Sequence, residues 1–468
     1  MRARSVAFLA LCVMCLPARA DDWPGFRGPG GSGVSSESKL PTDWSTSKNV
    51  EWKLKVPGVA WSSPVVVGDK VFVTTAITEK QTKPRPFGGF GGFGGGGGGG
   101  RPGGGRPGGG FGGGFGGGRA PDVVYRWEVH CIDRNNGKVL WKELAAEKKP
   151  AISATMGNSY ASETPITDGE RVYAYFGTNG GVYCFDLKGK KLWNKDLGSY
   201  QMQFGWGTGS SPVLEGDRLF IQCDNEKKSF LVALDKKNGK ELWRAERSER
   251  STWSTPFVWK NKKRTEIVAC GSRRAISYDP ATGKVLWELG GMSGSASASP
   301  VADDERIYFG CGMGGGMMGG GNSPLFAVKA GASGDITLKS GTTSNDGVAW
   351  SRTRSGPYIV SPLLYKGYLY VAEQRGGMLS CYDAKTGKPA YSRERLQGAR
   401  SFTSSPWAYD DKIFCLDEDG KTFVVQAGPE FKLLGKNELN EMFWSSPAIA
   451  GGALFLRGVD TLYCIRQK

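Results

Sequence analysis

The sequence has very few of the residues on which acid–base catalysts and metal sites usually depend. His130 is its only histidine, and it lies beside Cys131 in a predicted strand. A Ser-His-Asp mechanism or a multi-histidine metal site would have to use that one residue. We therefore interpret His130 as an ordinary strand residue, and we expect no catalytic residue and no metal ligand.

Patterns that pair cysteines are also missing. The chain contains ten cysteines, and the eight that lie outside residues 1–20 form no CxxC, CxxCH or adjacent pair. Outside the first twenty residues, one cysteine falls in each repeat unit, which makes a poor disulfide framework. Because buried free cysteine behaves as a small apolar residue, we expect mostly free thiols, and a bridge between units stays open. These cysteines are Cys131, Cys184, Cys223, Cys270, Cys311, Cys381, Cys415 and Cys464.

Long apolar runs are absent after the N-terminus, so no segment provides the roughly 20 residues that a membrane span requires. Residues 1–20 combine Arg2 and Arg4, an apolar stretch and Ala18-Arg19-Ala20. This pattern predicts a secretory signal that is cleaved after Ala20. We expect a protein exported to the periplasm or cell envelope, with no membrane span.

What the sequence does contain is a repeat. A Ser-Pro or Thr-Pro pair opens a short apolar run eight times, and most successive pairs are separated by one similar interval. A period of roughly 40 to 50 residues is typical of propellers and solenoids. The prolines are Pro64, Pro165, Pro212, Pro256, Pro300, Pro362, Pro406 and Pro447.

Each unit contains strands and turns but no segment with helical periodicity. In the third unit, Gly216-Asp217 and Asn238-Gly239 both suit two-residue hairpins, because these residues tolerate positive φ. A motif such as Asp235 to Trp243, DKKNGKELW, recurs as the closing strand of several units. The pattern predicts an all-β, eight-bladed β-propeller of four-stranded antiparallel blades in a single domain over 21–468.

The two ends of the chain suggest how the ring closes. The last unit ends at TLYCIRQK without a closing strand, whereas NVEWKLKV, with Trp52 in the tryptophan position, stands before the first opening strand. We expect the N-terminal strand to complete the last blade, which leaves no free sheet edge around the ring. Two insertions interrupt the units: a Gly-rich tract over 88–118, expected to be disordered, and a Gly/Met-rich tract over 310–324.

The repeats resemble the quinoprotein-type, PQQ-like propeller family, in WSSPVVVGDKVFV at 61–73 and DPATGKVLW at 279–287. The segment DDWPGFRGPGGSG at 21–33 is similar to the opening of many exported propellers with such repeats. This resemblance implies one of two functions. One is a dehydrogenase that binds pyrroloquinoline quinone (PQQ) and calcium, and the other is a non-catalytic propeller similar to the BamB outer-membrane assembly factor.

Residues that the resemblance associates with a dehydrogenase cannot be matched one by one. The adjacent cysteine pair is missing, and Glu163 and Asn158 are only two of many polar residues that could bind calcium. We therefore expect no cofactor, and PQQ with calcium remains the alternative. A polysaccharide lyase or hydrolase would need paired carboxylates, and no spacing in the sequence fixes such a pair.

The expected binding site is the rim of the central channel, where the blades converge. Aromatic residues stand just before most of the Pro pairs and could stack on a sugar, a peptide or a planar ligand. The candidate rim residues are Trp61, Tyr160, Glu163, Trp206, Trp253, Tyr358, Arg400, Phe402 and Trp444.

The charge of the chain indicates the kind of partner. Lysine and arginine outnumber aspartate and glutamate by 61 to 45, and the formal net charge is +16. A basic surface favours anionic partners. The function predicted from the sequence is an exported, monomeric, non-enzymatic scaffold that binds an envelope protein or an anionic glycan, and no nucleic acid. The alternative is a PQQ- and calcium-dependent alcohol or sugar dehydrogenase.

Overall fold

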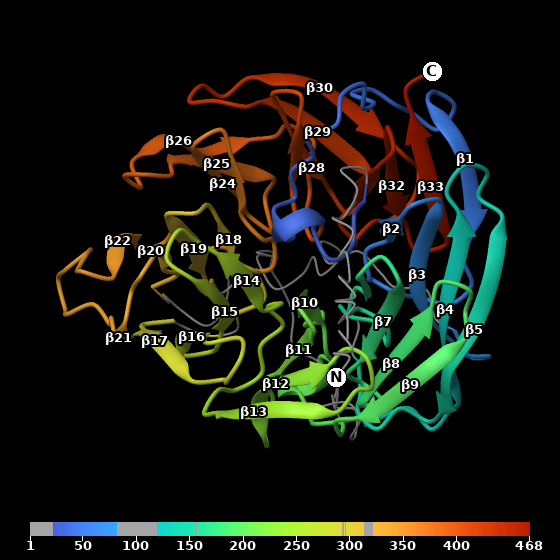
Figure 1. Ribbon diagram of the computed structural model, residues 1–468. Helices are drawn as coiled ribbons and strands as arrows, with labels where there is room; N and C mark the ends of the chain where they lie inside the picture. Colours follow the sequence, from blue (N-terminus) through green and yellow to red (C-terminus); the bar gives the residue numbers. More distant parts are fainter. Residues whose placement is uncertain (1–21, 82–118, 155–156, 293, 295, 313–321) are drawn as a thin grey trace, which may run out of the picture.

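The computed structural model describes residues 22–81, 119–154, 157–292, 294, 296–312 and 322–468. They form a ring of eight β-sheets around a central axis (Figure 1). The predicted eight-bladed all-β propeller is confirmed. The predicted signal over 1–20 and the tract over 88–118 lie outside the described residues, and the tract over 310–324 is described only at its two ends.

The blades follow one another in chain order, each from an inner strand to an outer one. They are β2(Val65–Val67) to β5(Val139–Lys148) through β3(Lys70–Ile77) and β4(Tyr125–Asp133); β6(Ile166–Thr167), β7(Arg171–Phe176), β8(Gly181–Asp186) and β9(Lys191–Asp196); β10(Val213–Glu215), β11(Arg218–Cys223), β12(Ser229–Asp235) and β13(Glu241–Arg247); β14(Phe257–Lys260), β15(Thr265–Cys270), β16(Arg274–Tyr278) and β17(Val285–Gly290); β18(Val301–Ala302), β19(Arg306–Gly310), β20(Leu325–Lys329) and β22(Val348–Arg352); β23(Leu363–Tyr365), β24(Tyr368–Ala372), β25(Met378–Asp383) and β26(Pro389–Arg395); β27(Trp407–Tyr409), β28(Lys412–Leu416), β29(Lys421–Gln426) and β30(Leu433–Glu438); and β31(Ala448–Ala450), β32(Ala453–Arg457) and β33(Thr461–Arg466) with β1(Val50–Lys55).

The core lies between neighbouring blades. The two middle strands of a blade are buried along almost their whole length, as in β11 and β12, whereas the outermost strand β13 is mostly half-buried or exposed. Side chains from adjacent sheets meet in shared clusters, for example Phe220 and Ala233 with Ile267 and Tyr278. Removal of these faces from water is the main force that holds the blades together.

The ring closes as predicted. Strand β1 pairs antiparallel with β33, with Trp52 opposite Cys464. The Trp52 indole Nε1 also donates a hydrogen bond to the carbonyl oxygen of Arg134 in the first blade, at 2.9 Å. The N-terminal strand therefore joins the last blade to the first.

The turn predictions are half right. Gly216-Asp217 forms the predicted two-residue hairpin between β10 and β11. The prediction for Asn238-Gly239 is wrong, because β12 and β13 are joined by the longer connection 236–240. The Asp235 carboxylate accepts the Lys237 amide at 2.7 Å, and the Asp235 carbonyl accepts the Gly239 amide at 2.8 Å. The side chain of Asp235 thus stabilises a wider turn than the Asn-Gly pair alone indicates.

One blade has an additional strand. The short β21(Gly334–Asp335) pairs in parallel with β17, so the fourth sheet has five strands. The sequence analysis did not predict it, because Gly334-Asp335 has no apolar alternation. Among the described residues, no helix is long and apolar enough to cross a membrane.

The segment before β1 closes one end of the channel. Its first part, residues 22–37, is named the plug here, and with η1(Pro29–Gly31) it lies across the centre of the ring (Figure 1). Trp23 exchanges two backbone hydrogen bonds with Val66 of β2, at 2.9 and 2.8 Å. On another side of the ring, Val34 forms a parallel bridge with Ala408 of β27.

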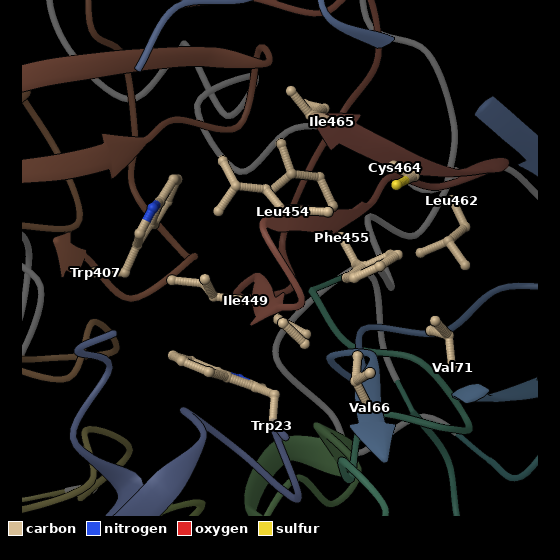
Figure 2. Packing of buried hydrophobic residues seen from close by; sticks show 14 of the residues in the cluster. Trp23, Val66, Val71, Trp407, Ile449, Leu454, Phe455, Leu462, Cys464 and Ile465 are labelled. Carbon is tan, nitrogen blue, oxygen red and sulfur yellow. The ribbon is translucent and has the colours of Figure 1, made fainter. Parts of the chain in front are cut away.

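The plug is also fixed by its side chains. The Trp23 ring packs against Val66, Trp407 and Ile449 in a cluster shared by the first, seventh and eighth blades (Figure 2). The Glu37 carboxylate accepts the amides of Gly451 and Gly452 at the β31–β32 turn, at 3.1 and 2.6 Å. These contacts lie at the end of the channel where the inner strands β2, β27 and β31 turn into the second strands of their blades.

Candidate binding face

The Ser-Pro and Thr-Pro pairs form a continuous ring of hydrogen bonds around the channel. The backbone N–H of each residue before proline donates to the side-chain hydroxyl of the equivalent residue in the next blade, with N···O distances of 2.9 to 3.2 Å. All of these residues are buried. We name this set the hydroxyl ring: Ser63, Thr164, Ser211, Thr255, Ser299, Ser361, Ser405 and Ser446. The pair that predicted the repeat therefore links each blade to the next.

The hydroxyl ring separates two ends of the channel. The plug contacts residues that follow the ring prolines, such as Val66 and Ala408. The candidate aromatic residues precede the ring hydroxyls in the chain, as Trp61 precedes Ser63. They therefore lie at the end opposite the plug, which we name the aromatic face.

Trp61 and Trp444 form a close aromatic pair on this face. Their rings stack with centroids 4.5 Å apart and an interplanar angle of 29°. Val59 and Val459 pack against them, and the two indoles are only 9% and 6% exposed. The pair joins the first and last blades, so its structural role is the packing of the ring closure.

A second aromatic group offers more accessible surface. Trp206 and Trp253 lie with ring centroids 5.7 Å apart, and both are half-buried. The Trp253 indole Nε1 donates to the Gly207 carbonyl at 2.8 Å, which fixes that ring. Tyr160 is linked to Trp206 through Ala154. The Tyr160 hydroxyl accepts a hydrogen bond from the Ala154 amide at 3.1 Å, and Ala154 forms an antiparallel β-bridge with Trp206. The structure therefore brings Tyr160, Trp206 and Trp253 together.

Glu163 is the titratable residue of this group. Its side chain is 1% exposed, and its Oε1 accepts the Gly177 amide at 3.0 Å. Burial raises the pKa of Glu163 to about 7, although hydrogen bonding from backbone amides such as that of Gly177 acts in the opposite direction. Glu163 therefore changes its protonation state near neutral pH.

The remaining candidates are Tyr358, Arg400 and Phe402. Tyr358 precedes β23 of the sixth blade, and Arg400 and Phe402 follow β26 of that blade. Tyr358 is half-buried, and burial raises its pKa. Arg400 is exposed and pairs with Asp419 at 3.3 Å. Phe402 is 1% exposed and packs edge to face against Phe423. Phe402 thus contributes to the core, and Arg400 remains at the surface.

A buried ion pair lies beside the group of Trp206 and Trp253. Arg247 binds Asp224 through two hydrogen bonds of 2.8 and 3.0 Å, and a third bond of 2.8 Å reaches the Tyr278 hydroxyl. Burial alone would lower the pKa of Arg247, but Asp224 and Tyr278 outweigh it and raise the pKa above its usual value. Thr252 and Gln222 donate further hydrogen bonds to Asp224, at 2.9 and 2.8 Å. The carboxylate is therefore fully satisfied.

A small cavity borders this network. It measures about 10 Å³, the space of about one water molecule. Ser210 Oγ and Gln222 Oε1 line it and have no hydrogen-bond partner among the described residues, so an ordered water fits there. The cavity is lined by Tyr175, Met202, Thr208, Gly209, Ser210, Gln222, Cys223, Asp224 and Thr252.

The buried nucleophiles and the histidine are structural. The eight cysteines outside the predicted signal are free and buried, and burial raises the pKa of Cys131 to about 12, which makes its thiol a poor nucleophile. His130 is 1% exposed and its Nε2 lies 2.8 Å from Glu128 Oε2. Burial lowers the pKa of His130, and Glu128 partly opposes that shift.

Asn158, one of the two calcium ligands considered above, is held by hydrogen bonds within the protein. Asn158 Nδ2 donates to the carbonyls of Trp206 and Thr208, at 2.7 and 2.8 Å, and its Oδ1 accepts the Ser159 amide and the Ser162 hydroxyl. Both ends of the amide are thus occupied. Within the described part of the chain, no group of three or more His, Cys, Asp or Glu residues could hold a metal ion.

Comparisons with known proteins agree with this architecture. Residues 100–255 match the family model described as outer membrane protein assembly factor BamB. The protein of that name from Shewanella oneidensis is 23% identical over 189 residues, which are 39% of this chain. The match covers 42% of the length of that relative, less than half. The predicted PQQ-like propeller family is confirmed.

Solved structures show the same PQQ-like propeller fold. A quinohemoprotein alcohol dehydrogenase from Comamonas testosteroni is 13% identical, with a TM-score of 0.61, over 96% of this chain and 80% of that one. A europium-containing methanol dehydrogenase is 11% identical, with a TM-score of 0.57, over 95% of this chain and 91% of that one. At such low identity, this likeness shows the fold alone.

Neither the plug of this PQQ-like propeller nor the ion pair of Asp224 with Arg247 was predicted from the sequence. A signal for the plug was present, because Trp23 and Arg27 stand in a Gly-rich segment that belongs to no repeat unit. No signal in the sequence identified the ion pair, because Asp224 and Arg247 resemble many other charged residues of the chain.

Proposed function

We propose that this chain is an exported scaffold that binds a protein partner at the cell envelope through its aromatic face. The observation that carries the proposal is the asymmetry of the channel. The plug covers one end, whereas Trp206 and Trp253 present half-buried indoles at the other. Amphipathic rings of this kind are enriched where proteins bind one another.

The match to BamB supports a role in the assembly of an envelope protein. The relative from Shewanella oneidensis carries the name outer membrane protein assembly factor. Export rests on the predicted signal over 1–20. The formal net charge of +16 favours an acidic partner surface, and an anionic glycan is the other partner of that chemistry.

The proposal can be tested with a variant confined to the aromatic face. Wild-type protein, the double variant Trp206→Ala with Trp253→Ala, and the control Leu242→Ala would each be immobilised and exposed to detergent-solubilised envelope from the source cells. Leu242 is 42% exposed on outer strand β13, so the control removes an apolar side chain elsewhere. We expect one envelope protein to bind the wild type and the control and to be lost from the double variant.

Two results would contradict the scaffold role on this face. One is equal retention of the same protein by all three forms. The other is binding of an acidic polysaccharide, but of no protein, by the wild type.

The dehydrogenase alternative needs its own measurement. Purified protein would be titrated with PQQ in the presence of calcium, and absorbance and dye reduction with alcohols would be followed. Quinone binding in the micromolar range with turnover would support the dehydrogenase. We expect neither, because Asn158 is held by structural hydrogen bonds.

A further inference from the structure

Arg27 of the plug is a buried cation with few partners. Its side chain is 2% exposed, and its Nη2 donates one hydrogen bond, to the Ser32 carbonyl at 3.3 Å. The Nε and Nη1 atoms are buried and have no hydrogen-bond partner among the described residues. The guanidinium is therefore removed from water, and most of its N–H groups have no hydrogen-bond acceptor among the described residues.

No acidic side chain of the described chain forms an ion pair with Arg27. Burial alone lowers its pKa, to about 9, so the guanidinium still carries its charge at neutral pH. A buried charge without a partner costs several kcal/mol, so a counter-charge is expected. Asp21 is the only acidic residue that the structure does not describe.

Arg27 lies where the plug meets the seventh blade, near the hydroxyl ring. A Cβ placed on Gly33 would lie 2.9 Å from Arg27 Nη2 and 3.2 Å from the Pro406 carbonyl, so the guanidinium lies beside the start of β27. Pro406 directly follows Ser405 of the hydroxyl ring. The ring hydroxyls accept backbone N–H groups, and none of them donates its own proton to an acceptor among the described residues.

The backbone at Arg27 is strained in a way that holds the side chain in place. Arg27 has a φ of 62°, in the left-handed region, which is unfavourable for a residue other than glycine. The next residue, Gly28, packs so closely on the Trp23 ring that a Cβ would lie 2.4 Å from Cδ2. This local conformation places an arginine in the interior of a basic protein, where no acidic side chain of residues 22–81, 119–154, 157–292, 294, 296–312 and 322–468 pairs with it.

We propose that the axial channel holds a small inorganic anion, bound by the Arg27 guanidinium and by protons of the hydroxyl ring. The guanidinium and hydroxyl donors suit a small inorganic anion such as phosphate, sulfate or chloride. The anion neutralises Arg27 and thereby stabilises the docked plug. Because Nε and Nη1 are buried, the ion enters as the plug docks and exchanges slowly afterwards.

The first test asks whether an anion is carried by the protein. Full-length protein would be purified in phosphate and chloride, dialysed exhaustively into HEPES without inorganic anions, and then unfolded in urea. Ion chromatography of the released solution should recover one anion in near-stoichiometric amount from the wild type. Arg27→Gln should release almost none, and Arg395→Gln, which removes an exposed arginine of β26, should release as much as the wild type.

The second test measures how the anion affects stability. Protein refolded without inorganic anions should gain thermal stability on addition of phosphate, sulfate or chloride, with a saturable dependence on concentration. Sulfate and phosphate also stabilise proteins by exclusion from their surface, but that effect does not saturate and is shared by the variants. The saturable part should be lost in Arg27→Gln and weakened in Arg27→Lys.

Several outcomes would overturn the proposal. Wild type that releases no anion and shows no saturable stabilisation would do so, even if Arg27→Gln fails to fold. Release of the same amount of anion from Arg27→Lys, Arg27→Gln and wild type would place the ion elsewhere. If Asp21→Asn is destabilised and the wild type releases no anion, the chain supplies its own counter-charge.

Discussion

Gly239 packs flat against the indole of Trp193 from the preceding blade. A Cβ on Gly239 would lie 2.6 Å from Cε3 of that ring, and the φ of Gly239 is 73°. The Trp193 Nε1 also donates to the Lys236 carbonyl at 3.1 Å, in the same turn. The same relation recurs between Gly137 and Trp52, Gly189 and Trp141, Gly283 and Trp243, and Gly387 and Trp350. The closing motif of one blade is thus the contact surface of the next.

The substitution Gly239→Ala should destabilise the protein by about 2 to 4 kcal/mol, because it adds both a positive-φ penalty and a steric overlap. Gly216→Ala is the matched control, since Gly216 has a φ of 59° but nothing within 4 Å of its Cβ position. The control should cost only about 1 kcal/mol. Urea denaturation followed by tryptophan fluorescence would measure both. Equal losses would show that the contact with Trp193 is unimportant.

The repeat made the fold predictable, and the reason lies in this contact. Five pairs of neighbouring blades meet through such a tryptophan and glycine, so the spacing of Asp235 to Trp243 recurs and identifies the unit. Trp52 revealed the ring closure in the same way. The segment of Trp23 and Arg27 stands out from the repeats, but its place across the ring was not predicted, because its partners lie in blades far away in the sequence.

The sequence predicted which positions could line the candidate site, but not which of those side chains are accessible. Aromatic residues were expected before the prolines, and Trp206 and Trp253 do meet there. Phe402 occupies the same place in its unit, yet it is buried against Phe423. The difference depends on how each loop packs on the next blade, which no spacing within one unit determines.

We expect the hydroxyl ring to tolerate an exchange of serine and threonine but not a substitution by alanine, because alanine has no hydroxyl to accept the neighbouring amide. In the wild type the Thr164 amide donates to Ser211 Oγ at 2.9 Å. Ser211→Ala would leave this buried amide without an acceptor and should lower the free energy of unfolding by about 1 to 3 kcal/mol. Ser211→Thr keeps the hydroxyl and should cost about 1 kcal/mol or less. Hydrogen exchange at the Thr164 amide should be faster in the alanine variant only. Equal exchange in both variants would be inconsistent with this role for the ring.

Asp224→Asn should be strongly destabilising, because Arg247 would remain buried without its counter-charge. The expected loss is about 3 to 5 kcal/mol. Glu305→Gln is the control, since it breaks the exposed ion pair with Lys262 and should leave stability almost unchanged. Adding Arg247→Met to Asp224→Asn should recover part of the loss by removing the unpaired charge. Thermal unfolding would measure all three, and a double variant less stable than Asp224→Asn would refute this explanation.

Glu163 should make the stability of the protein depend on pH in a defined direction. Burial raises its pKa from the usual 4.5 to about 7 in the folded state. Between those values the folded protein holds a proton that the unfolded chain has lost. The free energy of unfolding therefore falls as pH rises through this window. Glu163→Gln cannot titrate and removes this contribution.

The difference in unfolding free energy between wild type and Glu163→Gln should accordingly decrease by about 3 kcal/mol from pH 5 to pH 8. Asp417, whose pKa burial raises to about 6, acts in the same direction but is present in both proteins, so its effect cancels. The exposed Glu430→Gln is the matched control, and its difference from wild type should stay constant with pH. A constant difference for Glu163→Gln as well would mean that Glu163 is ionised in the folded state throughout, and that the Gly177 amide compensates its burial.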